Sequence, residues 1–462
     1  MRKYLSLIQE SLRGEQNDFT SGSIRRAMAL LAIPMMLEMA MESIFSLVDT
    51  YFVGKVSTEA LTTIGLTEVS LTIIYSLGIG LSIAPMAMIA RFIGEKEPQN
   101  AAKAARQAIW LAIGVSLLIA VPGTIYAPDL LRLMGGSEKV VAEGVTYTRI
   151  MYASNMVIML LFLLNGVFRG AGEATKAMRV LWLANGINII LDPIFIFGLG
   201  PIPAMGVTGA AVATTIGRSV GVGYQLYLLL GGRSVVNLSL GRWGLDMDMM
   251  RRLVRIASTG AFQYIIASAS WIVLMRIVAE TGGDATVAGY QVAIRLVIFT
   301  FLPAWGLANA TATFVGQNLG ADQANRAEKG VWMSLKLITA YMLIVGIIYV
   351  LAAEPLVYAF AEAEEARQPG VLSLRIFGFG YALFGTGMAF SNAFNGAGDT
   401  RTPTLLNFIA FWIIEMPLGY LFGIQFEWGL AGVCYALLIA NTVLGILAYI
   451  LFNMGKWKTV KV

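Results

Sequence analysis

The chain of 462 residues is 57% hydrophobic and only 13% charged, whereas a soluble domain carries about 25% charged residues. This composition excludes an ordinary soluble domain and predicts an all-α integral membrane protein. The chain has no histidine and a single cysteine, Cys434, which excludes an internal disulfide, histidine metal sites and histidine proton relays. The groups that can titrate are therefore carboxylates, tyrosines and lysines.

The first 27 residues lack the apolar core and cleavage site of a signal peptide, and they predict a short helix on the membrane surface in a cytoplasmic N-terminal segment. About twelve apolar runs follow that are long enough to cross a bilayer, which takes about 20 residues per helix. In chain order the predicted spans are 28–53, 61–90, 104–126, 145–168, 178–198, 206–231, 253–279, 286–315, 329–352, 371–394, 404–424 and 430–453.

Most of the 33 lysines and arginines fall on one side of this arrangement, the side of the N-terminus. Because cytoplasmic loops hold an excess of these residues, we expect both termini to be cytoplasmic, in a bacterial inner membrane. The same asymmetry accounts for the net charge of +5, so no nucleic-acid partner is needed.

The two halves of the chain repeat each other. ARFIGEKEPQNAAKAARQA at 90–108 matches ATFVGQNLGADQANRAEKG at 312–330, FRGAGEATKA at 168–177 matches FNGAGDTRTP at 394–403, and GVTGAAVAT at 206–214 matches GLAGVCYAL at 429–437. The pattern predicts two parallel six-helix bundles, residues 28–231 and 251–454, with a cytoplasmic linker at 232–250 and a cytoplasmic tail at 455–462. Transporters with such repeats bind substrate in a central cleft between the halves.

Acidic side chains inside the spans are the first functional candidates, because a charge at mid-bilayer costs about 2.5–3.5 kcal/mol on insertion scales. The first span holds Glu38, Glu42 and Asp49, which share one helical face at 100° per residue. In the fifth span Asp192 has Asn188 one turn before it and Pro193 directly after it, which predicts a kink and a freed carbonyl. Such oxygen groups suit a small hard cation or a proton.

Several motifs occur in order along the chain: SLVDTYFVG at 46–54, NGVFRGAGEAT at 165–175, LDPIFIFG at 191–198, GVTGAAVAT at 206–214, FLPAWGLANATATFVGQNLGA at 301–321 and NAFNGAGDT at 392–400. Together they resemble the multidrug and toxic compound extrusion (MATE) family, in particular its bacterial DinF-like branch. The resemblance implies export of cationic or amphipathic compounds in exchange for Na⁺ or H⁺. It also implies an ion-coupling site, with Asp49, Asp192 and Asn188 as ligands if the ion is Na⁺, and with Thr214 and Asn165 as further members.

Two departures from the family pattern concern the remaining acids. Some members place a sodium site in the C-terminal half, on acids of the seventh and tenth spans, but this chain has Gln263 in the corresponding stretch of the seventh and no acid in the tenth. Glu415 is predicted either to form a static cluster with Arg295 and Arg276 or to contact substrate. Glu38 and Glu42 are predicted to bind substrate, with pairing to Lys336 as the alternative.

The substrate surface is expected to draw on flexible methionines and on aromatic faces that attract cations. The candidate substrate-binding residues are Glu38, Glu42, Phe45, Met39, Tyr290, Arg295 and Glu415, and other aromatic candidates are Trp271, Trp305, Tyr381 and Phe384. The predicted partners are small-molecule drugs or toxic organic cations and the lipid bilayer, and the predicted state is a monomer.

The best-supported function is a secondary multidrug antiporter without a cofactor, driven by Na⁺ or H⁺. A lipid-linked oligosaccharide flippase of the same superfamily is the alternative, although it would need a strongly cationic cavity. An intramembrane enzyme is a third reading, but HExxH and GxSxG motifs are absent from the sequence. The glycine loops RGAGEAT and NGAGDT lack the spacing and lysine of a phosphate-binding loop.

The charge asymmetry generates a test of topology. In a Cys434→Ala background, a cysteine placed at Ala363, in the acidic loop 353–370, should react with an impermeant thiol reagent in intact cells. A cysteine placed at Ser239, in the linker, should not react, because the linker is predicted to be cytoplasmic. The reversed labelling pattern would show that the orientation is wrong.

Overall fold

The computed structural model describes all residues except 1, 16, 54–57, 240, 242 and 362, and the side chains of some neighbouring residues, including Asp49, also lie outside the described part. The described residues form helices throughout, apart from one isolated bridge between Leu199 and Ile202. The helices are α1 (Arg2–Arg13), α2 (Ile24–Val53), α3 (Thr58–Gly94), α4 (Pro98–Ile125), α5 (Ala127–Leu133), α6 (Glu138–Ala153), α7 (Asn155–Gly170), α8 (Ala174–Phe197), α9 (Val207–Leu230), α10 (Met247–Gly320), α11 (Ala324–Leu351), α12 (Ala353–Phe360), α13 (Arg367–Ala397), α14 (Arg401–Asn407), α15 (Met416–Tyr420) and α16 (Gly429–Asn453), with short helices η1 (Glu364–Ala366) and η4 (Lys456–Thr459) and π-helical stretches η2 (Phe408–Glu415) and η3 (Leu421–Gln425).

The predicted spans correspond to these helices. Within the described residues, nine helices are long and apolar enough to cross a membrane, and α6 and α7 form a further span bent by 41°. Helix α10 holds two of the predicted spans, because its backbone leaves helical geometry at Gly282 and Gly283. Helix α9, with 24 residues, is also long enough to cross, at about 20 residues per span. The all-α membrane fold expected from the sequence is confirmed.

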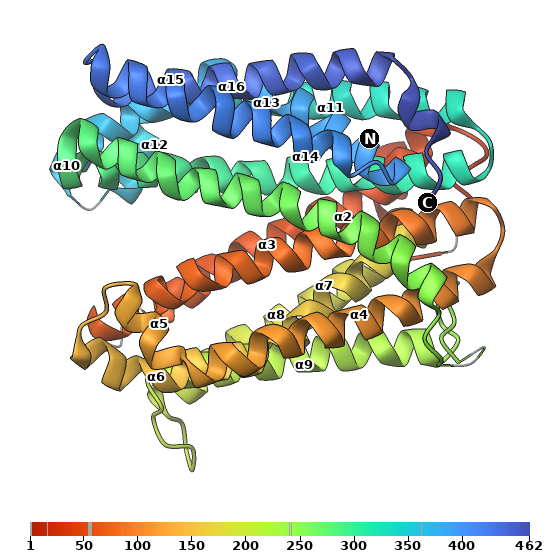
Figure 1. Cartoon of the computed structure of the whole chain (residues 1–462), viewed down its shortest axis with the longest axis horizontal. Coiled ribbons are helices and arrows are strands. Elements are labelled where there is room, and N and C mark those ends of the chain that lie inside the picture. Colours follow the sequence, from red (N-terminus) through yellow and green to blue (C-terminus); the bar gives the residue numbers. More distant parts are fainter. Residues whose placement is uncertain (1, 16, 54–57, 240, 242, 362) are drawn as a thin grey trace.

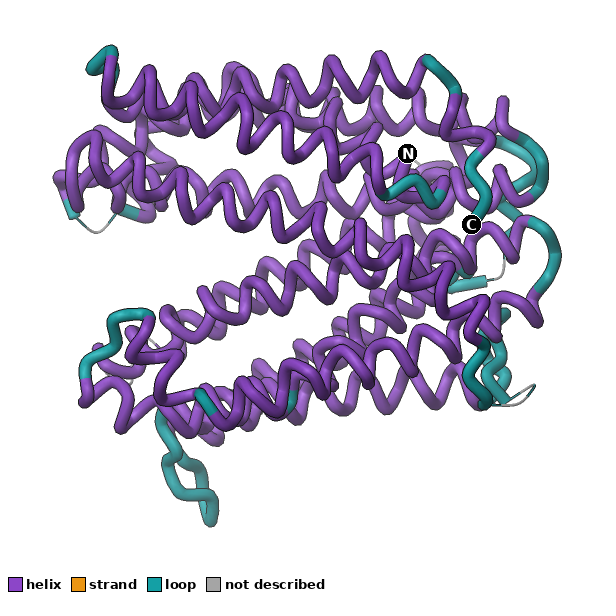
Figure 2. The backbone as a smooth tube through the Cα atoms, viewed as in Figure 1, coloured by secondary structure: helices purple, strands orange, loops and turns teal. Residues whose placement is uncertain are grey.

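The helices form two lobes that follow the sequence repeat. Helices α3 to α9 lie in one lobe and α10 to α16 in the other, and Figure 1 shows the lobes spread apart at one end and converging at the end where both termini lie. Loops gather at these two ends (Figure 2). Helix α10 begins at Met247, earlier than the predicted linker ends, because Asp246 caps it by accepting a hydrogen bond from the Met249 N–H at 2.8 Å.

Glycines bring the two lobes into direct backbone contact along α3 and α10. A Cβ atom added at Gly80 would lie 2.4 Å from the Gly260 carbonyl oxygen, and one added at Gly94 would lie 2.0 Å from the Gln317 carbonyl oxygen. A Cβ at Gly320 would in turn lie 2.1 Å from the Arg91 carbonyl oxygen. Small residues are what allow membrane helices to approach this closely, so these contacts form a glycine seam between the lobes.

Polar contacts reinforce the seam at the end that carries the termini. The side chains of Thr313 and Gln317, on α10, donate to the carbonyls of Arg169 and Gly170, at 3.0 Å each. The N-terminal segment touches both lobes: Arg179 donates to the Leu12 carbonyl at 2.6 Å, and Arg326 donates to the Ser21 carbonyl at 2.7 Å. The C-terminal tail also crosses the seam, because Arg91 donates to its Val460 carbonyl at 2.9 Å.

The glycine seam predicts a sharp dependence on side-chain size. Gly94→Val should destabilise the described arrangement of the lobes by about 1–3 kcal/mol, because overpacking of a close contact costs this much. The measurement is the midpoint of thermal unfolding in detergent. Gly114→Val is the matched control, since a Cβ at Gly114 meets no atom within 4 Å, and equal midpoints for the two variants would contradict the seam.

Candidate functional site

A buried ion pair joins α2 to α7 in the N-terminal lobe. The Glu38 side chain is fully buried, and its Oε1 accepts a hydrogen bond from Arg169 Nη2 at 2.6 Å. Asn165 Nδ2 lies 3.4 Å from the same oxygen, and Asn165 Oδ1 accepts from Gln225 Nε2 at 2.8 Å. A chain of polar groups therefore runs from α2 through α7 to α9. Burial makes such a network sensitive to the loss of any one member.

The other described acid of the first span faces the same way. Glu42 Oε2 accepts a hydrogen bond from Asn185 Nδ2, on α8, at 3.0 Å. Glu38 and Glu42 thus share a face toward the lobe interior, as predicted, while the Asp49 side chain lies outside the described part. The alternative of pairing with Lys336 is wrong: Glu38 pairs with Arg169 instead, and the Lys336 side chain is exposed.

The residues expected to form the ion-coupling site come together on α8 and α9. Asp192 is fully buried. The Asn188 side-chain amide forms hydrogen bonds through both its nitrogen and its oxygen. Its nitrogen donates to Asp192 Oδ2 at 2.9 Å, and its oxygen accepts from the Thr214 N–H at 2.9 Å and from the Thr214 hydroxyl at 3.1 Å. This set offers carboxylate, amide and hydroxyl oxygens, which are the ligands that hard cations prefer. Groups of three or more acids able to hold a metal do not occur among the described residues.

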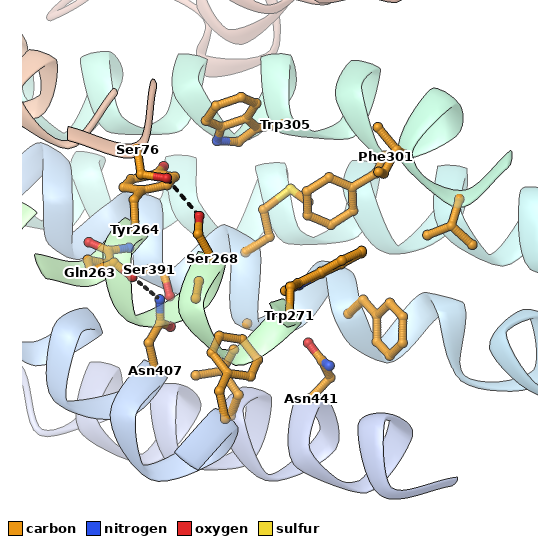
Figure 3. A pocket seen from close by; sticks show the side chains of 18 of the residues that line it. Ser76, Gln263, Tyr264, Ser268, Trp271, Phe301, Trp305, Ser391, Asn407 and Asn441 are labelled. Carbon is orange, nitrogen blue, oxygen red and sulfur yellow. Dashed lines mark hydrogen bonds between the residues drawn. The ribbon is translucent and has the colours of Figure 1, made fainter. Parts of the chain in front are cut away.

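A cavity of about 490 Å³ lies between the lobes (Figure 3). Most of its walls come from the C-terminal lobe, and α3 closes it from the N-terminal lobe with Thr72, Tyr75, Ser76 and Ile79. Its volume falls within the roughly 300–1,000 Å³ that is usual for small-molecule sites. Among the described residues that line it, Glu415 alone carries a charge.

The cavity wall is mostly aromatic and aliphatic, with a few neutral polar groups. Trp271, Phe301 and Trp305 are among its rings in Figure 3, and the Trp305 ring centre lies 6.1 Å from that of Tyr264. Ser76 and Ser268 bridge the two lobes with a hydroxyl–hydroxyl hydrogen bond of 2.7 Å. The surface suits an apolar molecule with one polar or charged end.

The predicted substrate residues divide between the cavity and the protein interior. Glu415, Trp271, Trp305 and Phe384 line the cavity, as a substrate role requires. Four of the other predicted residues are buried outside its lining: Met39, Phe45, Tyr290 and Tyr381. Tyr290 packs edge-on against Phe377, with ring centres 6.0 Å apart.

The predicted polar cluster around Glu415 is not formed. Arg276 pairs with Glu280, one turn along its own helix, at 3.2 Å. Arg295 is exposed and does not line the cavity. Glu415 forms no hydrogen bond or ion pair with any residue that the structure describes. The cluster does not form because the two arginines lie on exposed faces of α10 that point away from η2.

Sequence reasoning also missed Arg169 and Gln225 as members of the buried network. Arg169 lies just beyond the predicted fourth span, 145–168, but α7 continues through Arg169 to Gly170 and the guanidinium reaches Glu38. The signal was available in the sequence, since a buried carboxylate requires a partner and Arg169 is the basic residue of the last turn of that span.

Comparison with known proteins identifies the family to which this chain belongs. The MatE family model matches residues 34–194 and matches again at residues 260–421, which together exceed half of the chain. The chain belongs to the MATE family. It is therefore a membrane transporter, and the two successive matches coincide with the two halves of the sequence repeat.

Relatives of the MATE chain are similar over nearly their full length. A probable multidrug resistance protein NorM from Thermotoga maritima is 26% identical over 94% of this chain and 93% of its own. An FAD transporter from Shewanella oneidensis is 27% identical over 95% of this chain and 96% of its own. A solved structure of a multidrug resistance MATE transporter in an outward-facing conformation matches with a TM-score of 0.89 at 26% identity, over 96% of this chain and 100% of that one.

The buried ion pair generates a prediction about stability. Arg169→Met should destabilise the protein by about 3–5 kcal/mol, because it leaves the Glu38 carboxylate buried without its counter-charge, whereas removing both charges is often neutral. The thermal unfolding midpoint in detergent should therefore fall in Arg169→Met and recover in the Glu38→Met, Arg169→Met double variant.

The control for this prediction is an exposed pair of the same chemistry. Arg132 and Glu138 pair at 2.8 Å with both side chains largely exposed, and such surface pairs contribute about 0–1 kcal/mol. Arg132→Met should leave the midpoint nearly unchanged. A fall in Arg132→Met as large as that in Arg169→Met, or a double variant no more stable than the single one, would contradict the role assigned to the buried pair.

Proposed function

We propose that this MATE protein is a secondary multidrug antiporter that exports cationic or amphipathic compounds in exchange for Na⁺ or H⁺ by alternating access. The observation that supports it best is the cavity between the lobes, which is apolar, is large enough for a drug-sized molecule and has Glu415 as the single acid among its described lining residues. Multidrug resistance is also the role after which the T. maritima relative and the matched outward-facing structure are named.

The arrangement of the lobes supports the alternating-access part of the proposal. The lobes converge at the end that carries both termini and spread at the other (Figure 1). With both termini in the cytoplasm of a bacterial inner membrane, this arrangement is an outward-facing state. The inward-facing state then requires the contacts of the glycine seam, and those of the N-terminal segment and the C-terminal tail, to open.

The coupling ion is assigned to the N-terminal lobe. Asp192, Asn188 and Thr214 are hydrogen-bonded to one another, and we include Asp49 from the sequence motif and Asn165 from the neighbouring network. An ionised Asp192 would hold Na⁺ with the amide and hydroxyl oxygens, and the same carboxylate would take a proton in an H⁺-driven cycle. Na⁺ and H⁺ are distinguished by the experiment below.

Anionic substrates are disfavoured by the same cavity. A lipid-linked oligosaccharide, or a flavin nucleotide such as the FAD for which the S. oneidensis relative is named, would bring a pyrophosphate toward Glu415. The described residues that line the cavity include no lysine or arginine to pair with it. Like charges that are desolvated together repel strongly. A drug antiporter is therefore the better reading.

The transport prediction uses purified protein in proteoliposomes. Wild-type protein should move a cationic dye against its gradient when a sodium gradient or a pH gradient is imposed, and the effective gradient identifies the ion. Asp192→Asn, and separately Asp49→Asn, should insert normally and lose gradient-driven transport. Glu138→Gln, an exposed acid, is the control, and wild-type rates in both aspartate variants would show that coupling lies elsewhere.

A further inference from the structure

The sequence repeat allows the two lobes to be compared residue by residue. In the aligned segments 206–214 and 429–437, Thr214 corresponds to Leu437. Asp192 and Glu415 are the acids of the matching helices, each followed within two residues by a proline, and the residues one turn before them are Asn188 and Phe411. In the N-terminal lobe the acid Asp192 has the polar residues Asn188 and Thr214 beside it. In the C-terminal lobe the acid Glu415 has an aromatic and an aliphatic residue in their place.

The structure gives the two acids different surroundings. Asp192 is hydrogen-bonded by Asn188, which also bonds Thr214. Glu415 is 2% exposed, and it has no hydrogen bond or ion pair within the described part of the chain. Glu415, Phe411 and Leu437 all line the cavity between the lobes. The carboxyl group of Glu415 therefore lies in the cavity wall without a hydrogen-bonding or ionic partner among the described residues.

The backbone at Glu415 is also unusual. Glu415 is the last residue of η2, a π-helical stretch that begins at Phe408, and Pro417 follows two residues later. π-Helical turns inside α-helices are rare and occur frequently at functional sites. The widened turn therefore ends at Glu415, an acidic residue of the cavity wall.

The chemistry of this wall selects a class of ligand. A buried carboxylate is costly unless a positive charge pairs with it. A small hard cation needs several oxygen ligands, and the replacement of Asn188 and Thr214 by Phe411 and Leu437 removes two of them. An organic cation needs fewer oxygen ligands, because aromatic faces such as those of Trp271 and Trp305 attract its charge and the apolar wall contacts its hydrocarbon groups.

We propose that Glu415 is the charge-selecting residue of the substrate cavity, and that it pairs with the single positive charge of an amphipathic organic cation. In this division Glu415, which lies one residue from the repeat position that matches Asp192, binds substrate, and Asp192 binds the coupling ion. The proposal rests on the proposed transport function and adds the residue that distinguishes cations from neutral compounds. The Arg218 guanidinium donates a hydrogen bond to the hydroxyl of the lining residue Tyr75 at 3.1 Å, but Arg218 does not itself line the cavity.

The test measures binding to the full-length protein in detergent, without any ion gradient. The probes are tetraphenylphosphonium, which is a monovalent cation, and triphenylphosphine oxide, a neutral molecule of related shape. Glu415→Gln should weaken binding of the cation about 10- to 100-fold, as expected when one partner of a buried charge pair is lost, and leave binding of the neutral probe nearly unchanged. Glu415→Asp should restore much of the affinity for the cation.

Two outcomes overturn the proposal. If Glu415→Gln binds the cation as well as wild type does, Glu415 does not select charge. If it weakens the cation and the neutral probe equally, Glu415 maintains the shape of the cavity and not its charge preference. Glu138→Gln is the control, since it removes an exposed acid that does not line the cavity and should leave the affinity for the cation in place.

A double variant tests the same proposal by adding polar side chains next to Glu415. Phe411→Asn together with Leu437→Thr introduces the polar partners of the N-terminal set and should lower the affinity for tetraphenylphosphonium, because the carboxylate then acquires hydrogen bonds and loses an aromatic neighbour. An unchanged affinity would count against the proposal. Failure of gradient-driven transport in the wild type would remove the antiporter function, but a cation affinity that depends on Glu415 would still establish the site.

Discussion

The close backbone contact between α3 and α10 is the constraint on which the rest of the structure depends. It requires glycine at Gly80, Gly94, Gly260 and Gly320, because a single Cβ at Gly80, Gly94 or Gly320 would lie within about 2.4 Å of a facing backbone atom. By holding the lobes together at the end of the termini, the seam leaves the space between them at the other end, where the cavity lies. Since lipid supplies no hydrophobic drive between helices, shape complementarity of small residues has to provide this contact.

Duplication supplied two copies of one helical framework, and the structure shows how different chemistry was placed on each. In the N-terminal lobe the acids of α2 and α8 are held by amides and a guanidinium, as the Glu38–Arg169 pair and the Asn188–Asp192 contact show. In the C-terminal lobe the residue one turn before the acid Glu415 is Phe411 and the counterpart of Thr214 is Leu437, and all three line the cavity. One copy is built to hold a charge in a closed polar network, and the other presents a charge to an open apolar space.

The parts of this arrangement that were predictable from sequence are those set by local periodicity and by repeated motifs. Apolar length predicts the spans, and the motifs predict that Asn188, Asp192 and Thr214 meet. The ion pair of Glu38 was missed because it depends on how the end of α7 packs against α2, which no spacing within either helix determines. The cluster predicted at Glu415 was wrong for a related reason: Arg276 pairs with Glu280 and Arg295 is exposed, and position along the sequence does not determine toward which neighbour each face of α10 points.

The separation of the two acids constrains how ion and substrate can be coupled. Asp192 does not belong to the described lining of the cavity, whereas Glu415 does. If each binds the ligand proposed for it, the ion and the substrate do not compete for one carboxylate. Their effects on each other must then pass through a conformational equilibrium that both bias, and thermodynamic linkage makes those effects on affinity reciprocal. In the proposed alternating-access cycle, the element that changes is the packing of the lobes along the glycine seam, where Thr313 and Gln317 donate hydrogen bonds to the carbonyls of Arg169 and Gly170. Arg169 is also the partner of Glu38, so the network of the N-terminal lobe and the contact between the lobes share a residue. This shared residue is a physical route by which a change in charge within the N-terminal lobe can alter the stability of the outward-facing state.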